Sequence, residues 1–483
     1  MANCMEKNSA FQKLTLFDVT NLLIGAIVGA DIYVVASLGS QYLGPASLIA
    51  WIAAGLIAII IALNFAECAT LVPRVGGAYA YVQEVWGNFA GFVVGWALWL
   101  AEVAALAVFP VAFVRYFTFF FPSLTGAEGA AIKFGFIAII TYVNIRGTKM
   151  AGRTNDVLTI AKLSPLLLFI VVGFVYIAAN PVQTHANLVP FAPLGFSNFG
   201  AALVLIFWAY AGFELAVIPS NEIENPTRTI PKAIIVGMAI VTLFYLSTNF
   251  IILGVVNWTE LQFAPAPLAT AGSIVFSLTP TLALVGGLIL GVGALISVSG
   301  SDESGTLSTS RLAYAISLDG LFPRLFSEVH PTYGTPYKSL IAQGILALSL
   351  SLIGGLSQLI LFSTFNLAFV YLATCSVVLA LRERRRSGAS RTFVERMTGP
   401  ILPVAGILLS ALLIVESGVM TVVFGLVTIA IGIPIYAVYS PRKERTILKE
   451  AFYSTEAVLS RVARTQRVFL GYLLRLIARR RRM

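Results

Sequence analysis

Four ionisable side chains stand inside long apolar stretches of this 483-residue chain: Asp31, Glu102, Lys162 and Glu214. A charged group at the centre of a lipid bilayer costs roughly 2.5–3.5 kcal/mol on insertion scales. Each of these groups therefore needs a partner, water or a change of protonation. Carboxylates and an amine in such places are suited to binding charged small molecules and to moving protons.

Residue types that usually carry covalent or metal chemistry are scarce. The two histidines, His185 and His330, lie far apart, and the three cysteines, Cys4, Cys68 and Cys375, show no paired spacing. This pattern suggests neither a disulfide framework nor a thiolate metal site. We therefore expect no catalytic residues, no metal and no cofactor, and the chain does not read as an enzyme.

The composition places these side chains in a membrane. Apolar residues make up 58% of the chain and charged residues 11%, whereas a soluble domain carries about 25% charged residues. The mean hydropathy is +0.88. Apolar runs of about 18 or more residues recur, each long enough to span a bilayer. These features exclude a soluble globular protein, and the runs are too long for the alternating strands of a membrane β-barrel.

The apolar runs predict an all-α integral membrane protein of about twelve transmembrane helices. Residues 1–16 form a polar tail in which no removable signal peptide is recognisable. The expected helices are 17–40, 45–71, 86–120, 130–146, 155–179, 200–220, 232–256, 273–305, 339–355, 358–381, 400–416 and 419–439.

Positive charges are unevenly distributed between the two sides of these helices. With the N-terminus placed inside, 29 of the 32 Lys and Arg residues fall on the inner side. Arg115 and Lys133 fall near the outer face, and Lys162 lies within a span. Because short basic loops stay in the cytoplasm, we expect both termini to be cytoplasmic, in a plasma membrane or an inner (cytoplasmic) membrane.

The last segment, 441–483, is strongly basic. From Arg442 onward it holds twelve Lys or Arg residues against three Glu. Its apolar residues recur at three- or four-residue steps or sums of them, a pattern typical of an amphipathic helix on the anionic lipids of the inner leaflet. A solvated tail that only fixes the topology is the alternative. Nucleic acid is not an expected partner of a tail tethered to a membrane.

Two spans carry glycines and an acid where a continuous membrane helix would have larger apolar residues. The first contains Gly25, Gly29 and Asp31, and the sixth contains Gly212 and Glu214. Interrupted helices at matching positions are typical of transporter substrate sites, because unwound backbone exposes amides for a carboxylate and carbonyls for an ammonium. Small residues also serve helix packing. The matched pair favours two broken helices.

Several short motifs, in order and at the expected spacing, make the chain resemble the amino acid–polyamine–organocation (APC) transporter family over about residues 12–440. They are Gly25-Ala-Ile-Val-Gly29-Ala-Asp31-Ile-Tyr33, Glu67 followed by Pro73-Arg-Val-Gly-Gly-Ala-Tyr79, Asn144-Ile-Arg-Gly147, Gly212-Phe-Glu214, Glu222-Ile-Glu-Asn-Pro226 with Ile230-Pro231, and Arg311-Leu-Ala-Tyr314 with Asp319-Gly320 and Thr335-Pro336. The family's first-helix motif is normally G-x-x-x-G-x-G-I-F, so Asp31 departs from it.

The resemblance implies the LeuT-type fold. Two inverted five-helix repeats would occupy 17–180 and 200–381, and two additional helices would occupy 400–440. It also implies alternating access around a site between helices 1, 3, 6, 8 and 10, with Trp208 as a gating aromatic over the substrate. The backbone groups that would bind or face the substrate, by motif position, are those of Ile27, Val28, Gly29, Ala30, Asp31, Ala209, Ala211 and Gly212.

Lys162 resembles the helix-5 lysine of sodium-independent members of the family. In those members the ammonium contacts helices 1 and 8 in place of a sodium ion. The resemblance therefore favours coupling to protons through Lys162, with Glu214 at the gate or on the proton path. The alternative is a Lys162 side chain that extends to the inner membrane surface. Asp302 and Glu303 would either complete a network with Lys162 or cap a polar kink.

Acidic residues near the site bear on the substrate. Asp31 would repel a substrate carboxylate, so either it pairs with Lys162 or the substrate differs from that of the family. Glu102 falls where the family has a site-lining polar residue on helix 3, and its alternative role is a hydrogen bond between helices. Two acids near one site favour a cationic amino acid or an amine.

Together these observations predict a secondary active transporter of amino acids, leaning to cationic amino acids or amines, that is proton-coupled, sodium-independent and works by alternating access. One alternative is an amino acid or polyamine exchanger without net proton coupling. Another, from a different class, is a polytopic membrane transferase, which would need clusters of His, Asp or Glu in loops near the membrane surface.

Overall fold

A computed structural model describes residues 14–72, 74, 76–147, 151–216, 223–385 and 391–440, with only the backbone described for 151–161 and 215–216. Helices account for nearly all of this part of the chain. The all-α fold class is thereby confirmed. The predicted tails lie outside the described residues, apart from 14–16 of the first.

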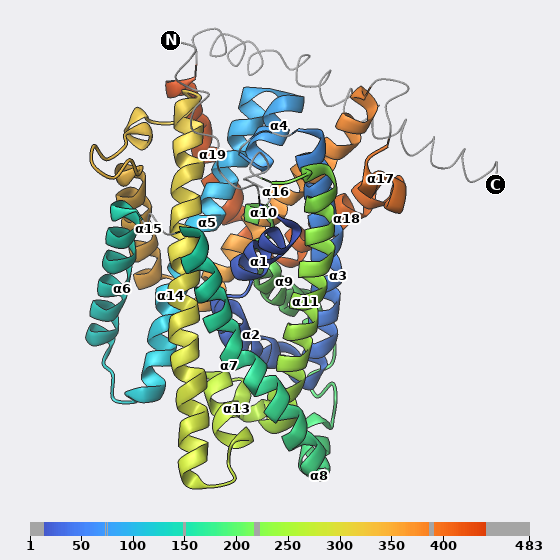
Figure 1. The fold of residues 1–483 in the computed structure, drawn as a ribbon, viewed down its shortest axis with the longest axis vertical. Helices are drawn as coiled ribbons and strands as arrows, with labels where there is room; N and C mark the ends of the chain where they lie inside the picture. The colour runs from blue at the N-terminus through green and yellow to red at the C-terminus, as the bar shows by residue number, and fades with distance from the viewer. Residues whose placement is uncertain are drawn as a thin grey trace, which may run out of the picture.

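The first half of the chain folds into eight α-helices, with a short 3₁₀ turn, Gly44–Ala46, between the second and third (Figure 1). These helices are α1 (Leu16–Ile27), α2 (Ala30–Leu43), α3 (Ser47–Leu71), α4 (Ala78–Trp86), α5 (Asn88–Phe120), α6 (Gly126–Arg146), α7 (Ala151–Ala179) and α8 (Pro181–Leu188).

The second half, within the described residues, continues with eleven α-helices and two 3₁₀ turns, η3 (Trp208–Tyr210) and η5 (Arg324–Ser327). The helices are α9 (Phe199–Phe207), α10 (Phe213–Ala216), α11 (Pro226–Val255), α12 (Trp258–Leu261), α13 (Pro267–Val275), α14 (Pro280–Leu318), α15 (Tyr337–Ile353), α16 (Leu356–Arg384), α17 (Phe393–Thr398), α18 (Ile401–Glu416) and α19 (Val419–Tyr439).

The expected helix at 273–305 is wrong at both ends. A separate helix, α13, ends at Val275, and α14 begins at Pro280, where the Thr279 side chain accepts a hydrogen bond from the Leu282 amide at 3.2 Å. A proline in the first turn with a threonine N-cap is a strong start signal. The helix then continues to Leu318 through a serine-rich segment, in which the Ser304 and Ser308 hydroxyls donate to carbonyl oxygens four residues earlier.

Within the described residues, eight stretches are long and apolar enough to cross a membrane, one of them combining α2 and α3. Four shorter apolar helices, Leu16–Ile27, Phe199–Tyr210, Tyr337–Ile353 and Ile401–Glu416, overlap the expected spans 17–40, 200–220, 339–355 and 400–416. Two of these short helices are the first parts of the two spans in which glycines predict a break. The count of twelve crossings stays a prediction.

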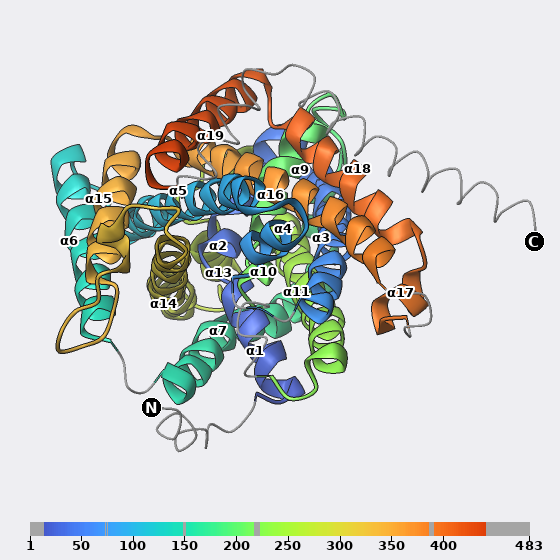
Figure 2. The same cartoon turned by 90° about the horizontal axis from the view of Figure 1, so that it is seen from above.

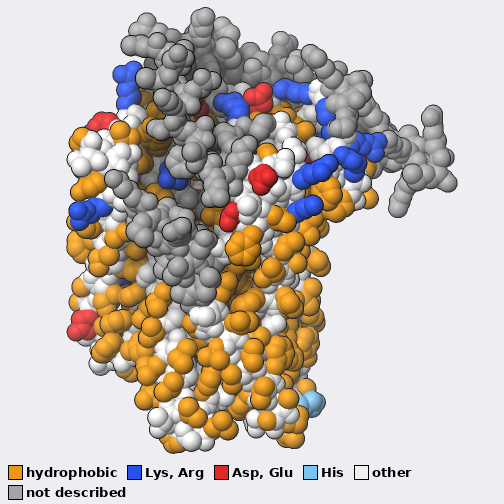
Figure 3. All heavy atoms as spheres, in the orientation of Figure 1, with side chains coloured by type: hydrophobic (Ala, Val, Ile, Leu, Met, Phe, Trp, Pro, Cys, Tyr) orange, Lys and Arg blue, Asp and Glu red, His pale blue; other side chains and the backbone are white. Residues whose placement is uncertain are grey.

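The helices divide into a buried core and a periphery. The most apolar windows of α5 and α16, which pack against each other, are 67% buried, whereas those of α6 and α19 are 17% and 22% buried (Figure 2). Twelve of the 14 residues of α2 are buried. Apolar side chains cover most of the visible face, and Lys and Arg gather towards the end where α4 and α17 lie (Figures 1 and 3). This distribution fits a protein surrounded by lipid.

Candidate functional site

The first span is interrupted between α1 and α2. Val28 leaves the helical conformation with ψ 103°, and Gly29 follows with φ −141° and ψ −137°. A side chain at position 29 would place its Cβ 2.8 Å from the Ser301 hydroxyl oxygen on α14. Glycine at position 29 therefore allows α14 to approach the backbone of the break closely.

The sixth span is interrupted between α9 and α10. After the 3₁₀ turn η3, Ala211 is extended with ψ 157° and Gly212 has φ +116°. A Cβ at Gly212 would lie 2.8 Å from the Ala26 carbonyl oxygen on α1. The two breaks therefore lie against each other. The α-helix of the sixth span is interrupted over Trp208–Gly212, as the sequence predicts, first by the 3₁₀ turn and then by non-helical backbone.

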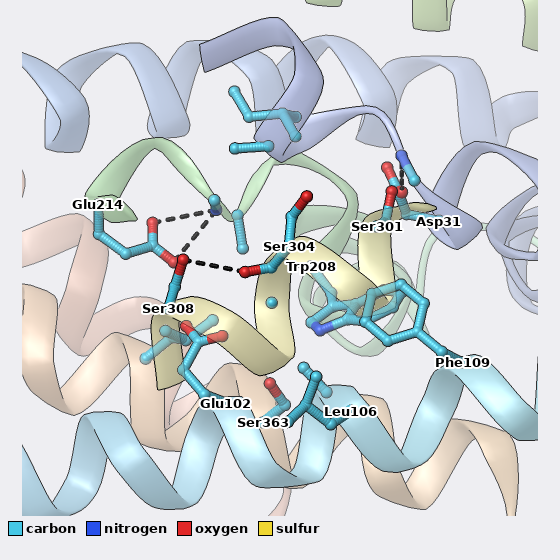
Figure 4. A pocket seen from close by; sticks show the side chains of 18 of the residues that line it. Asp31, Glu102, Leu106, Phe109, Trp208, Glu214, Ser301, Ser304, Ser308 and Ser363 are labelled. Carbon is cyan, nitrogen blue, oxygen red and sulfur yellow. Dashed lines mark hydrogen bonds between the residues drawn. The ribbon is translucent and has the colours of Figure 1, made fainter. Parts of the chain in front are cut away.

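A cavity of about 130 Å³ lies between the two breaks and three further helices (Figure 4). A cavity needs a volume of about 10–15 Å³ to hold one water molecule, so this cavity has room for a small organic molecule. Its lining comes from α1–α2 (Leu22, Gly25, Ala26, Ile27, Gly29, Asp31), α5 (Glu102, Ala105, Leu106, Phe109), α9–α10 (Trp208, Ala211, Gly212, Glu214), α14 (Ser301, Ser304, Gly305, Ser308) and α16 (Ser363, Leu367).

These helices correspond to the first, third, sixth, eighth and tenth expected spans, which the family resemblance places around a substrate. Of the predicted site residues, eight line the cavity: Ile27, Gly29, Asp31, Glu102, Trp208, Ala211, Gly212 and Glu214. Four others, Val28, Ala30, Ala209 and Lys162, are buried but are not among the lining residues. Substrate contact by any of them stays a prediction.

The polar face of α14 is the part of the cavity that sequence reasoning missed. Ser301, Ser304, Gly305 and Ser308 line it, whereas the sequence suggests for this segment either a network with Lys162 or a polar kink, and no serine in contact with a substrate. Their spacing of three and four residues is the signal that places them on one helix face. Ser363 on α16 carries no such signal, since it is a single serine in an apolar run.

Asp31 is buried and both of its carboxylate oxygens are engaged. Oδ1 accepts a hydrogen bond from the Gly29 amide at 2.7 Å, and Oδ2 accepts one from the Tyr245 hydroxyl on α11. Among the described residues it forms no ion pair within 4.0 Å. Asp31 therefore makes no direct ion pair with Lys162, which is one of the two expected options, and turns back over its own helix break.

Lys162 lies on α7, and its side chain is buried rather than extended to the membrane surface. Its Nζ donates to the Gly25 carbonyl oxygen at 3.1 Å and to the Ser301 hydroxyl at 3.4 Å. The ammonium thus connects α7 to α1 and α14, the two helices that the resemblance implies. Ser301 also donates to the Val28 carbonyl oxygen at 3.4 Å, so one short network holds the end of α1 against α14.

Two glutamates, Glu214 on α10 and Glu102 on α5, line the cavity (Figure 4). Glu214 accepts the Gly212 amide through both oxygens at 3.1 Å and the Tyr371 hydroxyl at 3.1 Å. Glu102 is buried on α5 and has no hydrogen bond to any described residue, so the expected alternative of an interhelical bond is not supported.

Within the described residues, no group of three or more His, Cys, Asp or Glu side chains lies close enough together to hold a metal ion.

Trp208 and Phe109 form an apolar wall of the cavity, with ring centroids 6.4 Å apart (Figure 4). Asp302 and Glu303 lie on α14 outside the lining. The Asp302 oxygen Oδ1 is buried without a described hydrogen-bond partner, and neither acid makes an ion pair with Lys162 within 4.0 Å in the part of the chain described. The expected network with Lys162 is therefore not formed by direct contact.

Known proteins resemble this chain over most of its length. The branched-chain amino acid permease of Bacillus subtilis (strain 168) is 30% identical over 460 residues, covering 91% of this chain and 95% of that protein. The methylthioribose transporter of the same organism is 29% identical over 84% of this chain and 88% of that protein. The human cationic amino acid transporter 4 is 27% identical over 77% of this chain and 60% of that protein.

The sequence pattern of the family described as amino acid permease matches residues 14–447. This range includes both helix breaks and every residue that lines the cavity. Members of the family named above are transporters or permeases, so the membrane transferase alternative does not apply. The chain belongs to the amino acid permease family and is a multi-pass membrane transporter rather than an enzyme.

Proposed function

We propose that this protein is a secondary active transporter of cationic amino acids or amines, driven by protons, independent of sodium and working by alternating access. The observation that carries the proposal is the acidic lining of the cavity between the two helix breaks. Asp31, Glu102 and Glu214 line it, and no Lys, Arg or His is among its described lining residues. A site of this charge attracts a cation.

The backbone of the first break supports recognition of an ammonium group. Ala26 lines the cavity in the last turn of α1, where carbonyl oxygens lack helical partners, whereas those of Gly25 and Ile27 already accept from Lys162 and Tyr245. The negative end of the α1 dipole favours positive charge at the same place. One relative is named for cationic amino acids and another for branched-chain amino acids, so a cationic side chain is consistent with the names of similar proteins.

Lys162 and Glu214 support coupling to protons. Lys162 holds the Gly25 carbonyl oxygen and Ser301, so loss of its proton would weaken the link between α1 and α14. Glu214 joins the second break to Tyr371 on α16. Each group connects one broken helix to a neighbouring helix, which is where alternating access requires movement.

The proposed arrangement has two inverted repeats, 17–180 and 200–381, followed by 400–440. Both termini would be cytoplasmic in a plasma or inner membrane, with 441–483 bound to anionic lipids. A second candidate, exchange without net proton coupling, is favoured by one comparison: a serine/threonine exchanger of Bacillus subtilis is 29% identical over 83% of this chain and 90% of that protein.

Uptake into proteoliposomes under imposed proton or sodium gradients tests the proposal. Radiolabelled arginine, lysine and putrescine should enter faster with an inward proton gradient, and sodium should have no effect. Lys162→Ala should abolish the acceleration by protons. Lys133→Ala is the matched control, because Lys133 lies in α6 and donates to Ser351 away from the cavity.

The outcomes separate the candidates. Acceleration by sodium but not by protons would overturn the role of Lys162, as would unchanged proton-driven uptake in Lys162→Ala. Uptake that needs an internal substrate and ignores both gradients would favour the exchanger. Better competition by neutral amino acids than by arginine, lysine or putrescine would overturn the cationic preference.

A further inference from the structure

At each helix break, a backbone amide donates a hydrogen bond to a carboxylate two residues later in the same span. At the first break the Gly29 amide donates to Asp31, two residues later, at 2.7 Å. At the second break the Gly212 amide donates to both oxygens of Glu214, again two residues later, at 3.1 Å. Both carboxylates line the cavity and both are buried (Figure 4). These two amides are therefore engaged within the protein.

The hydroxyl groups of the lining are engaged as well. All four serines of the lining donate to backbone carbonyl oxygens: Ser301 to Val28, Ser304 to Gly300, Ser308 to Ser304 and Ser363 to Ala101. Lys162 is not a lining residue, and its ammonium is held by Gly25 and Ser301. The indole N–H of Trp208 is the side-chain donor left, and it is neutral.

The cavity thus offers hydrogen-bond acceptors and three acidic side chains but few free donors that would bind an anion. Amide-to-carboxylate hydrogen bonds are among the stronger ones in proteins, so a substrate carboxylate would have to displace Asp31 or Glu214 to reach either amide. It would also approach three carboxylates at close range. Glu102 lines the cavity and has no hydrogen bond to a described residue, so its carboxyl oxygens are available to accept from an ammonium group (Figure 4).

We infer that the cavity takes an organic amine without a carboxylate, a monoamine or a polyamine, in preference to the amino acid that differs from it only by a carboxylate. The inference rests on the proposed function, in which this cavity is the transport site. In this arrangement Asp31 and Glu214 occupy the places at the breaks where a substrate carboxylate would bind, and Glu102 binds an ammonium group.

Matched pairs test this inference, because each pair differs by one carboxylate: agmatine and arginine, cadaverine and lysine, putrescine and ornithine. Each member competes for uptake of the radiolabelled twin into proteoliposomes. The amine should have a half-inhibitory concentration about tenfold or more below that of the amino acid, the size expected for one charge-assisted interaction. Equal or better competition by the amino acid would overturn the inference and leave the proposed function intact. Uptake of no member of any pair would overturn the proposed function instead.

Substitutions at Asp31 and Glu102 test the assignment of roles. Asp31→Gly frees the Gly29 amide, so the ratio of arginine to agmatine affinity should shift about tenfold or more towards arginine. Glu102→Gln should weaken the binding of arginine and of agmatine by the same factor, because both molecules carry a cationic group. Glu260→Gln, on the exposed helix α12, is the matched control and should change neither the affinity ratio nor the two affinities.

Two outcomes contradict the inference. One is an unchanged ratio of arginine to agmatine affinity in Asp31→Gly, and the other is an unchanged agmatine affinity in Glu102→Gln. Because Glu102→Gln keeps the side-chain volume, it still gives a result if Asp31→Gly fails to fold.

Discussion

At the scale of single residues, the contact between Tyr245 and Asp31 fixes the geometry of the first break. The Tyr245 hydroxyl donates to Asp31 Oδ2 and lies 3.3 Å from the Ile27 carbonyl oxygen. The other oxygen of Asp31 holds the Gly29 amide. One tyrosine on α11 therefore orients the carboxylate and touches the last residue of α1.

Tyr245→Phe should destabilise the protein, because it leaves a buried carboxylate oxygen without its donor. The expected loss is about 1.5–3 kcal/mol, the range for hydrogen bonds to charged groups. Chemical denaturation in detergent micelles measures it. Tyr142→Phe, at an exposed tyrosine of α6, is the control and should change stability little. In an Asp31→Ala background the cost of Tyr245→Phe should shrink; an equal cost in both backgrounds would mean that the two groups are not coupled.

The sequence predicts that the ionisable residues of the spans face inward, because lipid penalises them everywhere else. Asp31, Glu102, Lys162 and Glu214 are all buried. The sequence does not predict which groups these side chains contact. Lys162 is one expected partner of Asp31, and the structure has Tyr245 in that place. The choice depends on how α11 is rotated against α2, and a single sequence holds no information about that rotation.

At the scale of the elements, the two broken helices depend on glycines that touch neighbouring backbone. Gly212 has a positive φ of +116°, and a Cβ added there would lie 2.8 Å from the Ala26 carbonyl oxygen. Neither the conformation nor the space suits a side chain. The close approach of α10 to α1 is therefore possible only with glycine at this position.

Gly212→Ala should lower stability by about 1–3 kcal/mol, the usual cost of a residue held in a sparsely populated backbone conformation. It should also impair uptake, because the two breaks must separate to accommodate the Cβ. Gly135→Ala is the matched control: Gly135 is helical, with no atom within 4 Å of a Cβ there. That change should be neutral or stabilising by up to about 1 kcal/mol. Equal stability of the two variants, measured by thermal denaturation in detergent, would show that the second break is not tightly packed.

Glycine and acid patterns predict where both spans break, because glycine and a carboxylate are both unfavourable in a continuous helix at mid-membrane depth. They do not predict how much helix follows the break. Only Phe213–Ala216 is helical after Gly212 before the gap in the described residues, and α13 separates from α14. Such lengths depend on loops that pack against other helices, so hydropathy alone misplaces the boundary near residue 273.

At the scale of the whole molecule, a buried ion pair joins the two halves of the chain. Arg382 on α16 binds Glu67 on α3 through two hydrogen bonds of 2.7 and 2.6 Å, and it also donates to the Gly399 carbonyl oxygen at 2.8 Å. The two side chains are 6% and 0% exposed. The family motifs include Glu67. Its partner Arg382 lies among several basic residues at the end of α16, and the sequence uses these residues only to assign the inner side of the membrane.

Glu67→Gln should cost about 3–5 kcal/mol, because it leaves the Arg382 charge buried without its counterion. The exposed pair Arg74–Glu84, with side chains 53% and 49% exposed, provides the control. Glu84→Gln should cost at most about 1 kcal/mol. Thermal denaturation of the purified variants in detergent compares them. Similar losses for both substitutions would show that the buried pair does not hold α3 to α16.

The fold class and the family follow from the sequence because both rest on repeated signals: long apolar runs, and motifs spread from the first span to the loop after the eighth. The positions of the site helices follow from the same motifs. The donor and acceptor balance of the cavity does not, because it depends on which carbonyl each serine reaches. Ser363, for example, bonds to Ala101 on another helix.

Protection of a cavity cysteine by substrate tests most directly whether this cavity holds the transported molecule. Ser304→Cys, in a Cys4→Ala background where Cys68 and Cys375 are buried, would be labelled by a cationic thiol reagent in detergent. Ser197→Cys, exposed and outside the cavity lining, is the control. Saturating agmatine should slow labelling at position 304 and leave position 197 unchanged. Labelling at position 304 that stays as fast with agmatine and arginine as without them, in a protein that transports either one, would contradict the account.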